Sequence, residues 1–509
     1  MLLKMQKIDY VLDRITMYRL VLYILIALVC IACILGYFSL VPASPKYIVI
    51  SAVALIAVGW IANFIFSWAY DAPTNIESVY ITALILTLIM SPALSLSGLI
   101  VVCWAVVLAM LSKFALAINK KHIFNPAAIG VVITGLVLGE PASWWVGTAW
   151  MAPFIALSGL LIIRKLRFYD LAWGFFMVTI VAALVIGALK GSSLQSSLTR
   201  VVMDSYMLFL GSIMVTEPLT MPPIKKLQML YGGLVGFLAI PQVSILGFTF
   251  SPEMALCIGN IFAFLVSPKY KLVLMLTDRI QVAKGAMDFV FRPSQKISYM
   301  PGQYMEWTLS HPHFDSRGNR RYFTLASSPT EETIRLGVKF SENGSSYKRA
   351  LTTLDNYTPI VAAQLSGEFT LPKNPKQKLA FFAGGIGITP FRSMIKYLLD
   401  INESRDIVLC YANKTEDEIA YRDIFDDAQK RFGTKVIYTL TDKQSIPANW
   451  SGAVGRIDEE MIKREIPDYK ERLFYLSGPQ TMVNSYEKVL KHMKVPHKNI
   501  KKDFFPGLA

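Results

Sequence analysis

The chain has 509 residues, of which 53% are hydrophobic, and its formal net charge is +15. This length suffices for three or four domains, and the hydrophobic excess is concentrated before Ser267. In a chain this apolar, an excess of positive charge is first interpreted as a sign of membrane topology. The sequence contains no patch of mixed basic and aromatic residues that would indicate a nucleic-acid partner. Four of the five cysteines lie in apolar segments, which argues against a disulfide framework.

Ten apolar segments predict a multi-span α-helical membrane domain of about ten helices over residues 1–272. A transmembrane helix needs about 20 residues, so the shorter segments, which contain Pro and Gly, are expected to be broken or re-entrant. The basic stretch Met1–Leu20 has no small-residue cleavage site and predicts a retained first span. The segments are Leu20–Val41, Tyr47–Trp68, Ser78–Met90, Leu96–Leu111, Asn125–Leu138, Trp144–Ile163, Phe168–Leu189, Ser205–Val215, Leu230–Leu246 and Met254–Val266.

The basic residues between these segments predict the orientation. With ten spans, one side would receive most of them, and the other side only Lys46, Lys190 and Arg200. By the positive-inside rule the first side is the cytoplasm, which places both termini there, in a plasma membrane of bacterial type. The cytoplasmic groups are the N-terminus, Lys120-Lys121, Arg164–Arg167, Lys225-Lys226, Lys269 and Lys271.

Beyond Lys271 the composition becomes that of soluble domains. Over residues 273–373, short alternating runs such as Met305–Leu309 and Thr333–Phe340 predict an antiparallel β-barrel domain. Over residues 374–509, strand-like runs alternate with helical stretches, which predicts an α/β domain with a parallel sheet. These runs are Leu379–Ala383, Asp406–Tyr411, Lys435–Thr439 and Leu473–Leu476.

A glycine-rich turn, Gly384–Pro390 (GGIGITP), connects the apolar run Lys378–Ala383 to the helix-like segment Phe391–Leu399. In this setting backbone N–H groups and a helix N-terminus bind pyrophosphate, so the turn predicts a dinucleotide site. Further motifs accompany it along the chain: Arg321–Ser327 (RYFTLAS), Gly344–Tyr347 (GSSY) and Ser477–Met482 (SGPQTM).

This order of motifs resembles the ferredoxin–NADP⁺ reductase superfamily, in which a flavin-binding barrel precedes a nicotinamide-binding domain. The resemblance covers about Asp278–Phe505 and implies hydride transfer from NAD(P)H to FAD. It implies that Arg321 pairs with the FAD pyrophosphate, since a guanidinium binds phosphate oxygens bidentately. It also implies that Phe323 lies against the isoalloxazine ring and that Thr324 reaches the flavin N5 region.

The same resemblance implies the remaining contacts. Ser477 stands where the family often has Cys beside the nicotinamide, so Thr324 and Ser477 are expected next to the chemistry. The tail Asp503–Gly507 would place an aromatic residue near the flavin. The other implied FAD contacts are Tyr322, Gly344, Ser345 and Ser346, and the implied nucleotide contacts are Gly384, Gly385, Gly387, Thr389, Pro390, Gly478 and Pro479.

Flavin is the expected carrier in the membrane domain. Only His122, of five histidines, lies near the apolar half, which argues against haem between paired histidines. Cys30 and Cys33 form a C-x-x-C sequence inside the first span, but cysteine in an apolar segment is more commonly a small apolar residue than an iron–sulfur ligand. Because Cys410 is the only cysteine of the soluble half, no iron–sulfur spacing is present there, and no metal site is expected.

Two segments, Phe124–Gly130 and Val215–Pro223, loosely resemble parts of the flavin-carrying membrane subunits of the sodium-pumping NADH:quinone reductase and of the Rnf complex. In those subunits FMN is esterified to Thr in an S-G-A-T-type sequence. No such sequence occurs here, so a non-covalent FMN or other flavin is expected. The segment Trp144–Thr148, in a predicted outer loop, lies near the place where the flavin-attachment sequence would fall. The alternative for Asn125 and Glu217 is turn or helix-cap chemistry. The expected flavin contacts are Asn125, Thr216, Glu217 and Thr220.

These features predict a membrane-bound flavoprotein oxidoreductase. Hydride would pass from cytoplasmic NAD(P)H to FAD, and electrons would continue through a membrane flavin to an extracytoplasmic acceptor or a quinone. The alternatives are a quinone reductase whose electrons never cross the membrane, and an ion or small-molecule transporter driven or regulated by a reductase domain. The choice between NADH and NADPH stays open, since Lys414 favours a 2′-phosphate whereas Glu416 and Asp417 oppose it.

Overall fold

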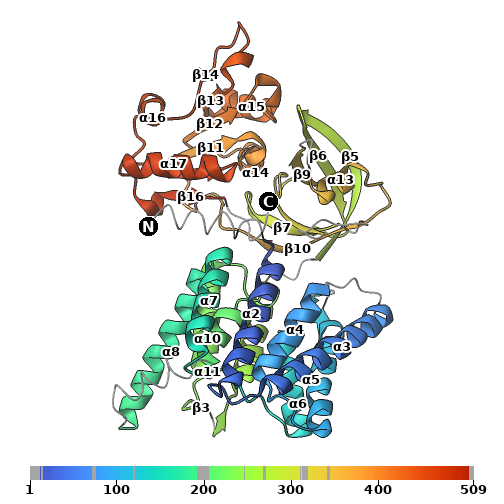
Figure 1. The fold of residues 1–509 in the computed structure, drawn as a ribbon. Coiled ribbons are helices and arrows are strands. Elements are labelled where there is room, and N and C mark those ends of the chain that lie inside the picture. Colours follow the sequence, from blue (N-terminus) through green and yellow to red (C-terminus); the bar gives the residue numbers. More distant parts are fainter. Residues whose placement is uncertain are drawn as a thin grey trace. The chain divides into compact units, whose positions relative to one another are not determined.

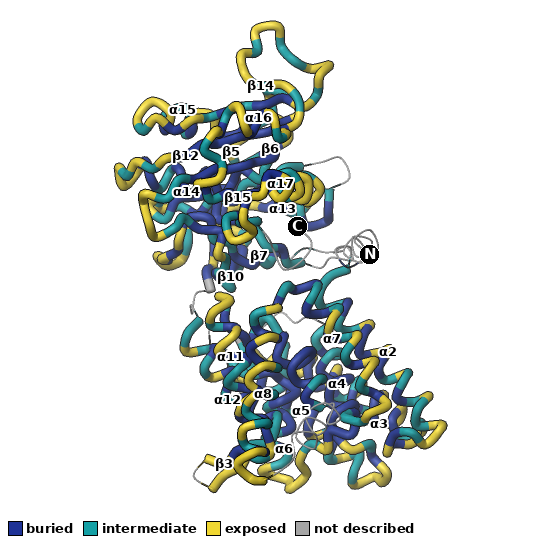
Figure 2. Tube along the Cα trace, turned by 90° about the vertical axis from the view of Figure 1, so that its left-hand side faces the viewer, coloured by how far each residue is buried: buried dark blue, intermediate teal, exposed yellow. Residues whose placement is uncertain are grey.

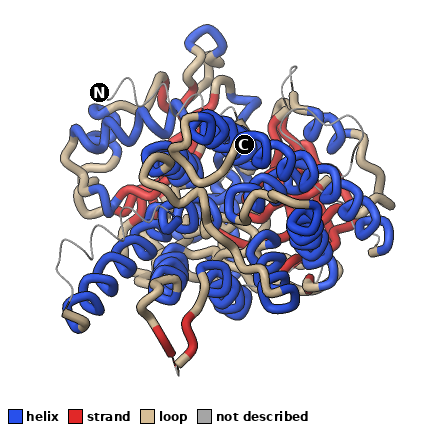
Figure 3. The backbone as a smooth tube through the Cα atoms, turned by 60° about the horizontal axis from the view of Figure 1, so that its bottom comes forward, coloured by secondary structure: helices blue, strands red, loops and turns tan. Residues whose placement is uncertain are grey.

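The computed structural model divides into two compact units, Met1–Lys269 and Tyr270–Phe505, apart from the last residues of the chain (Figure 1). Among the described residues, the regular secondary structure of the first unit is helical apart from two short hairpins, whereas the second unit combines strands and helices. Figure 3 colours helices, strands and loops separately along the chain. The structure describes residues 12, 15–70, 76–118, 121–191, 206–245, 247–267, 271–309, 311, 319–340 and 344–503.

Each of the ten apolar segments overlaps a helix of the first unit. Four described helices, α2, α3, α5 and α8, are long and apolar enough to cross a membrane. The other helices are shorter, so a crossing by ten spans stays a prediction. The helices are α2 (Met17–Tyr37), α3 (Pro45–Ala69), α4 (Ile76–Ile89), α5 (Leu96–Ala115), α6 (Pro126–Leu138), α7 (Ala152–Leu166), α8 (Tyr169–Leu189), α10 (Tyr206–Phe209) with the π-helical turn η1 (Leu210–Met214), α11 (Lys225–Leu238) and α12 (Pro252–Val266).

The two hairpins of this unit are β1 (Ala117–Ile118) with β2 (Lys121–His122), and β3 (Ser244–Ile245) with β4 (Phe248–Thr249). Burial follows the inner faces of the helices, whereas outward-facing apolar side chains are exposed (Figure 2). On α3, for example, Ile61, Phe64 and Trp68 are 60%, 67% and 80% exposed. Apolar exposure of this kind is rare in water-soluble monomers.

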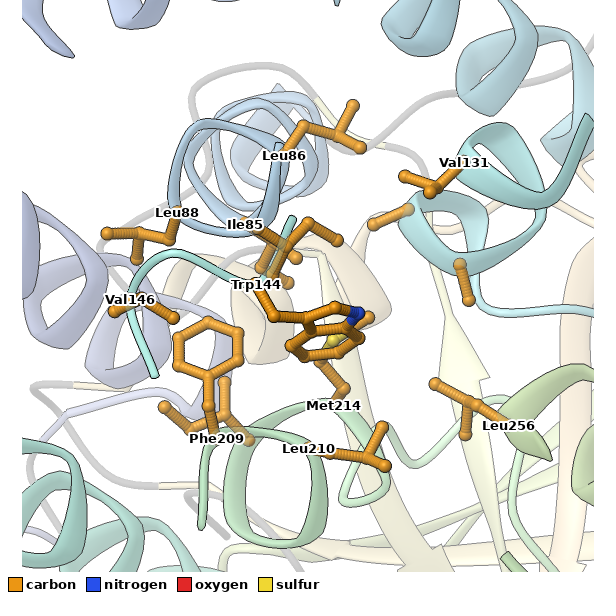
Figure 4. Close-up of a cluster of buried hydrophobic side chains, with 14 of the residues drawn as sticks. Ile85, Leu86, Leu88, Val131, Trp144, Val146, Phe209, Leu210, Met214 and Leu256 are labelled. Carbon is orange, nitrogen blue, oxygen red and sulfur yellow. The ribbon is translucent and has the colours of Figure 1, made fainter. Parts of the chain in front are cut away.

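The segment expected as an outer loop, Trp144–Thr148, is non-helical, but its first side chains are buried. Trp144 packs among Leu86, Val131, Met214 and other apolar side chains (Figure 4). The backbone N–H of Trp144 donates to Ile89 O at 2.8 Å, and the Trp145 indole donates to Thr87 O at 3.0 Å. These bonds satisfy carbonyls at the end of α4, which is how irregular backbone is tolerated inside a membrane protein.

The second unit begins with a curled six-stranded sheet in which all paired strands are antiparallel. Its order is β8-β7-β10-β5-β6-β9. Alternate side chains such as Trp307, Leu336 and Phe289 fill its core, as the period-2 pattern requires. The elements are β5 (Lys271–Ala283), β6 (Ala286–Pro293), β7 (Tyr304–Thr308), β8 (Arg320–Thr324), β9 (Ile334–Lys339), α13 (Ser346–Thr352) and β10 (Ile360–Ser366).

A second six-stranded sheet follows, with parallel pairs throughout and the order β14-β13-β12-β11-β15-β16. Helices α14 and α15 cover one face, and α16 and α17 cover the other. The elements are β11 (Leu379–Gly384), η2 (Gly385–Ile388), α14 (Thr389–Asp400), β12 (Ile407–Asn413), η3 (Glu416–Glu418), α15 (Arg422–Phe432), β13 (Lys435–Leu440), η4 (Lys443–Ser445), β14 (Ala453–Val454), α16 (Glu459–Glu465), β15 (Leu473–Ser477), α17 (Gln480–His492), η5 (His497–Asn499) and β16 (Ile500–Lys502).

This strand order places a topological switch point between β11 and β15. From β11 the chain runs outward through β12, β13 and β14, and it then returns to β15 on the other side of β11. Ligands of open parallel sheets bind outside the carboxyl ends of the strands at such a point. The boundary expected between residues 373 and 374 falls in the connection between β10 and β11.

Candidate functional sites for redox cofactors

The glycine turn and the Ser477 segment meet at the switch point. A Cβ on Gly387 would lie 2.5 Å from Gly478 Cα and 2.7 Å from the carbonyl carbon of Ser477. Gly478 itself has φ +149°. The two loops therefore pack backbone against backbone, and this close approach requires glycine at both positions.

The other side of the turn is open. Gly385 has φ +52°, and a Cβ there would meet no atom within 4 Å. Thr389 begins the 12-residue helix α14, and Pro390 occupies its first turn, where its missing N–H costs no hydrogen bond. An open glycine loop that leads into a helix N-terminus suits a pyrophosphate.

Ser477 ends β15 and is 1% exposed. Its hydroxyl donates to Asp503 Oδ2 at 3.0 Å, and Asp503 N donates to Leu476 O at 2.9 Å. The serine hydroxyl is thus engaged by the C-terminal segment, beside Gly478 and Pro479. The aromatic residues of the tail that were expected near the flavin lie outside the described residues.

On β8 the period of two divides the predicted FAD contacts between two faces. Arg321 and Phe323 share one face, and Tyr322 and Thr324 share the other. The Arg321 guanidinium lies 5.3 Å from the centre of the Tyr347 ring, and the Phe323 ring lies 5.9 Å from the same ring. Arg321 also donates to Arg320 O at 2.6 Å.

The GSSY segment packs beside this cluster, because Ser345 is the N-cap of α13 and accepts from Lys348 N at 3.3 Å. The Gly344 carbonyl accepts from Arg349 at 2.6 Å. Ser346 Oγ lies 3.2 Å from His311 Nε2. The structure therefore brings Arg321, Phe323 and Ser346 together around Tyr347.

His311 also belongs to this group, although the sequence did not predict it. It lies far from α13 along the chain, so no local pattern links the two. On the opposite face of β8, the Tyr322 hydroxyl donates to Gln364 Oε1 at 3.3 Å. Thr324 is 5% exposed and pairs with Tyr304 across the sheet.

A buried polar pair connects the antiparallel sheet to the residue that precedes α15. The Tyr421 hydroxyl, from the start of α15, donates to Asp288 Oδ1 on β6. Asp288 is fully buried, and burial raises the pKa of its carboxyl, although the Tyr421 bond and the charges of Arg392 and Arg335 partly oppose this. Burial also raises the pKa of Tyr421 well above its ordinary value.

A polar cluster forms in the helical unit around Glu217. Asn125 Nδ2 donates to Glu217 Oε2 at 2.8 Å, and the Thr220 hydroxyl donates to the same oxygen at 3.3 Å. His122 Nε2 lies 3.4 Å from Glu217 Oε1. Asn260 on α12 accepts from Asn125 N at 2.8 Å through Oδ1. Three of the four predicted membrane-flavin contacts thus come together.

The fourth predicted contact, Thr216, bonds instead to its own helical turn, with 3.1 Å to Ser212 O and 2.9 Å to Ile213 O. Asn125 also caps α6, since its Oδ1 accepts from Ala128 N at 3.1 Å. The Asn125 side chain therefore caps α6 and contacts Glu217 at the same time. A second carboxylate, Glu253, is 3% exposed and accepts from the Trp144 indole at 3.0 Å.

Comparisons with known proteins concern the second unit. Residues 381–488 match the family model of the oxidoreductase NAD-binding domain. The flavohemoprotein of Oceanobacillus iheyensis is 24% identical over 241 residues, which are 45% of this chain and 58% of that protein. The flavohemoprotein of a Burkholderia species is 29% identical over 234 residues, with shares of 45% and 58%.

The glycine betaine monooxygenase reductase subunit of Chromohalobacter salexigens is 25% identical over 218 residues, which are 42% of this chain and 58% of that protein. The flavohem-like FAD/NAD-binding domain of nitric oxide dioxygenase from Vibrio cholerae aligns with a TM-score of 0.40 and 18% identity, over 46% of this chain and 98% of that one. The chain thus spans less than two thirds of the curated relatives it matches.

Proposed function

We propose that the chain is a membrane-bound flavoprotein oxidoreductase that transfers hydride from NAD(P)H to FAD and passes electrons to a second flavin in its helical unit. An FAD/NAD-binding domain of ferredoxin reductase type is the part of this proposal that the family model and the relatives support directly. The observation that carries the proposal is the glycine turn, which has an open flank and lies beside Ser477 at the switch point of the parallel sheet.

The FAD site is proposed at the Arg321–Phe323 face of β8. Arg321 supplies the charge and the fork geometry that a pyrophosphate takes. The Phe323 and Tyr347 rings supply apolar surface for the cofactor, and Ser346 supplies a hydroxyl. FAD, when bound, contributes the hydride-accepting ring, while these side chains hold and orient it.

The membrane part of the proposal rests on the helical unit. Its four long apolar helices and exposed apolar faces support association with a bilayer. The cluster around Glu217 offers amide, hydroxyl and carboxylate groups at helix ends, and such groups can hydrogen-bond a heterocyclic ring. Residues that keep polar groups inside a membrane domain are functional candidates. The final acceptor is proposed to be a quinone or an extracytoplasmic molecule.

The experiment counts flavins in the purified full chain, together with a test for covalent linkage. We expect more than one flavin per protein, and a ratio of one would remove the membrane carrier. Arg321→Ala is expected to remove or weaken FAD binding while the second flavin stays. Arg320→Ala is the matched control, because its side chain pairs with Glu306 at 3.3 Å and lies on the other face of the strand.

Retained FAD and full NAD(P)H oxidation in Arg321→Ala would refute the FAD site. A transporter with a regulatory reductase domain is the competing function. It predicts a single flavin together with solute flux that depends on the redox state of the protein.

A further inference from the structure

Arg392 joins helix α14 to the segment that follows β8, and the proposed cofactor sites assign this residue no role. This residue lies in the first turns of α14, shortly after the glycine turn, and is 3% exposed. Its Nη1 donates to Ala326 O at 2.7 Å and to Glu331 Oε2 at 2.8 Å, and its Nη2 donates to Glu331 Oε1 at 3.1 Å. The guanidinium therefore makes bidentate hydrogen bonds to one carboxylate and a further hydrogen bond to a backbone carbonyl.

A second bond lies beside it. The Ser393 hydroxyl, fully buried, donates to Ser327 O at 2.6 Å. Glu331 is held in turn, because Ser328 N donates to its Oε2 at 2.6 Å. Consecutive residues of α14 thus bind consecutive carbonyls of the segment that follows β8.

A close backbone approach supports the same connection. A Cβ on Gly337 of β9 would lie 2.7 Å from Thr389 Cγ2 and 2.6 Å from the Tyr421 hydroxyl. The antiparallel sheet therefore abuts the first residue of α14, which leaves little freedom for the glycine turn to move relative to it.

The positions of these bonds along the chain give them a consequence for hydride transfer. Ala326 is two residues beyond Thr324, and Arg392 is three residues beyond Thr389. The flavin-binding strand and the nucleotide-binding turn are therefore joined by a short and well-packed path. Hydride transfer depends steeply on the distance between donor and acceptor, and a displacement of about 1 Å costs about 100-fold in rate.

We infer that Arg392 is a positioning residue, which fixes the nucleotide loop to the flavin-binding strand so that the two bound cofactors face each other at reacting distance. The inference rests on the proposed hydride transfer from NAD(P)H to FAD. Ser393 and Glu331 serve the same positioning role. None of the three needs to touch a reacting atom.

The test measures three quantities in the full chain: FAD per protein, the dissociation constant of NAD(P)H, and the rate constant for flavin reduction in a single turnover. In Arg392→Lys the charge stays but the fork is lost. We expect normal FAD content, a little-changed dissociation constant and a rate constant lowered about 10- to 100-fold. Arg392→Met is expected to lower the rate further.

The matched control is Arg472→Lys. Arg472 is also buried, at 6% exposure, and grips Asp468 with Nε at 2.7 Å and Nη2 at 3.0 Å, but its partners all lie within the parallel-sheet domain. Equal losses of rate in Arg392→Lys and Arg472→Lys would overturn the inference, as would an unchanged rate in Arg392→Lys.

Ser393→Ala keeps the test decisive where an arginine variant fails to fold. It removes one hydroxyl, and we expect a smaller but measurable loss of rate with normal FAD content; an unchanged rate would count against the inference. Failure of the wild-type chain to reduce its flavin with NAD(P)H would instead refute the proposed function itself, so the two failures are distinct.

Discussion

Gly387→Ala perturbs the nucleotide site through one methyl group. The added Cβ would lie 2.5 Å from both Cα and N of Gly478 and 2.7 Å from the carbonyl carbon of Ser477. All three atoms belong to the backbone, so no flexible side chain can move aside. We therefore expect the glycine turn and the Ser477 loop to be pushed apart.

The size of the displacement follows from ordinary contact distances. Carbon atoms in contact lie about 3.5–4.0 Å apart, so relief of the clash needs about 1 Å of loop movement. Overpacking of this kind costs about 1–3 kcal/mol of stability. A 1 Å displacement at the site is expected to lower the rate of hydride transfer about 100-fold.

The assay is NAD(P)H oxidation with an artificial electron acceptor, accompanied by FAD content and thermal unfolding. Gly384→Ala is a graded comparison, since its Cβ would clash chiefly with the Met482 side chain, which can rotate away. Gly433→Ala controls for general strain, because it has φ +68° but open space and lies at the end of α15. Unchanged kcat and KM in Gly387→Ala would refute the packing of these loops.

Three further predictions address other contacts. Burial by itself would raise the pKa of Glu331, but hydrogen bonds and charge from Arg392 outweigh it and lower this pKa. The ionised carboxylate therefore stabilises the fold above its unfolded pKa of about 4.3 and loses that effect as the pH falls through its lower folded pKa. The stability gap between the native chain and Glu331→Gln, from thermal unfolding, should shrink below about pH 4.3, and a gap that widens there would contradict the assignment. Ser477→Ala removes the hydroxyl that donates to Asp503 and should lower the free energy of unfolding by about 1 kcal/mol. We expect this variant to retain NAD(P)H oxidation. Complete loss of oxidation would show that the hydroxyl itself is required. Asn125→Ala should lower the content of the second flavin and cost about 0.5–2 kcal/mol through the lost helix cap. Asn125→Asp keeps the cap but replaces the amide donor to Glu217 with a second carboxylate, so equal flavin content in wild type and both variants would exclude this residue from the membrane site.

Local patterns predicted much of the secondary structure. The apolar segments contain helices because an uninterrupted apolar run satisfies its own backbone only as a helix in an apolar setting. The glycine turn leads from a strand into a helix as expected, since the glycines permit the turn and Pro390 suits the first turn of a helix. The count of membrane spans and the membrane flavin stay predictions, because helix length and composition alone do not locate a bilayer.

Other features depend on the tertiary structure. The amide of Asn125 meets the carboxylate of Glu217, and Arg392 meets Glu331, across 92 and 61 residues of sequence. Trp144 is buried although it lies in a loop. No periodicity records which side chains meet after packing, so these partners were not predictable from the chain.

The sequence by itself determined that an apolar helical half precedes a reductase-like half, and it determined which turn leads into the nucleotide-binding helix, because hydrophobic patterning and backbone preferences are local properties. Only the tertiary structure decided that Arg321 and Phe323 gather around Tyr347 while Thr324 faces the other way. It also decided that α14 is bonded to the segment after β8. The reason is that strand order and register, which arise only when distant segments pair, decide which neighbours each face of a strand meets.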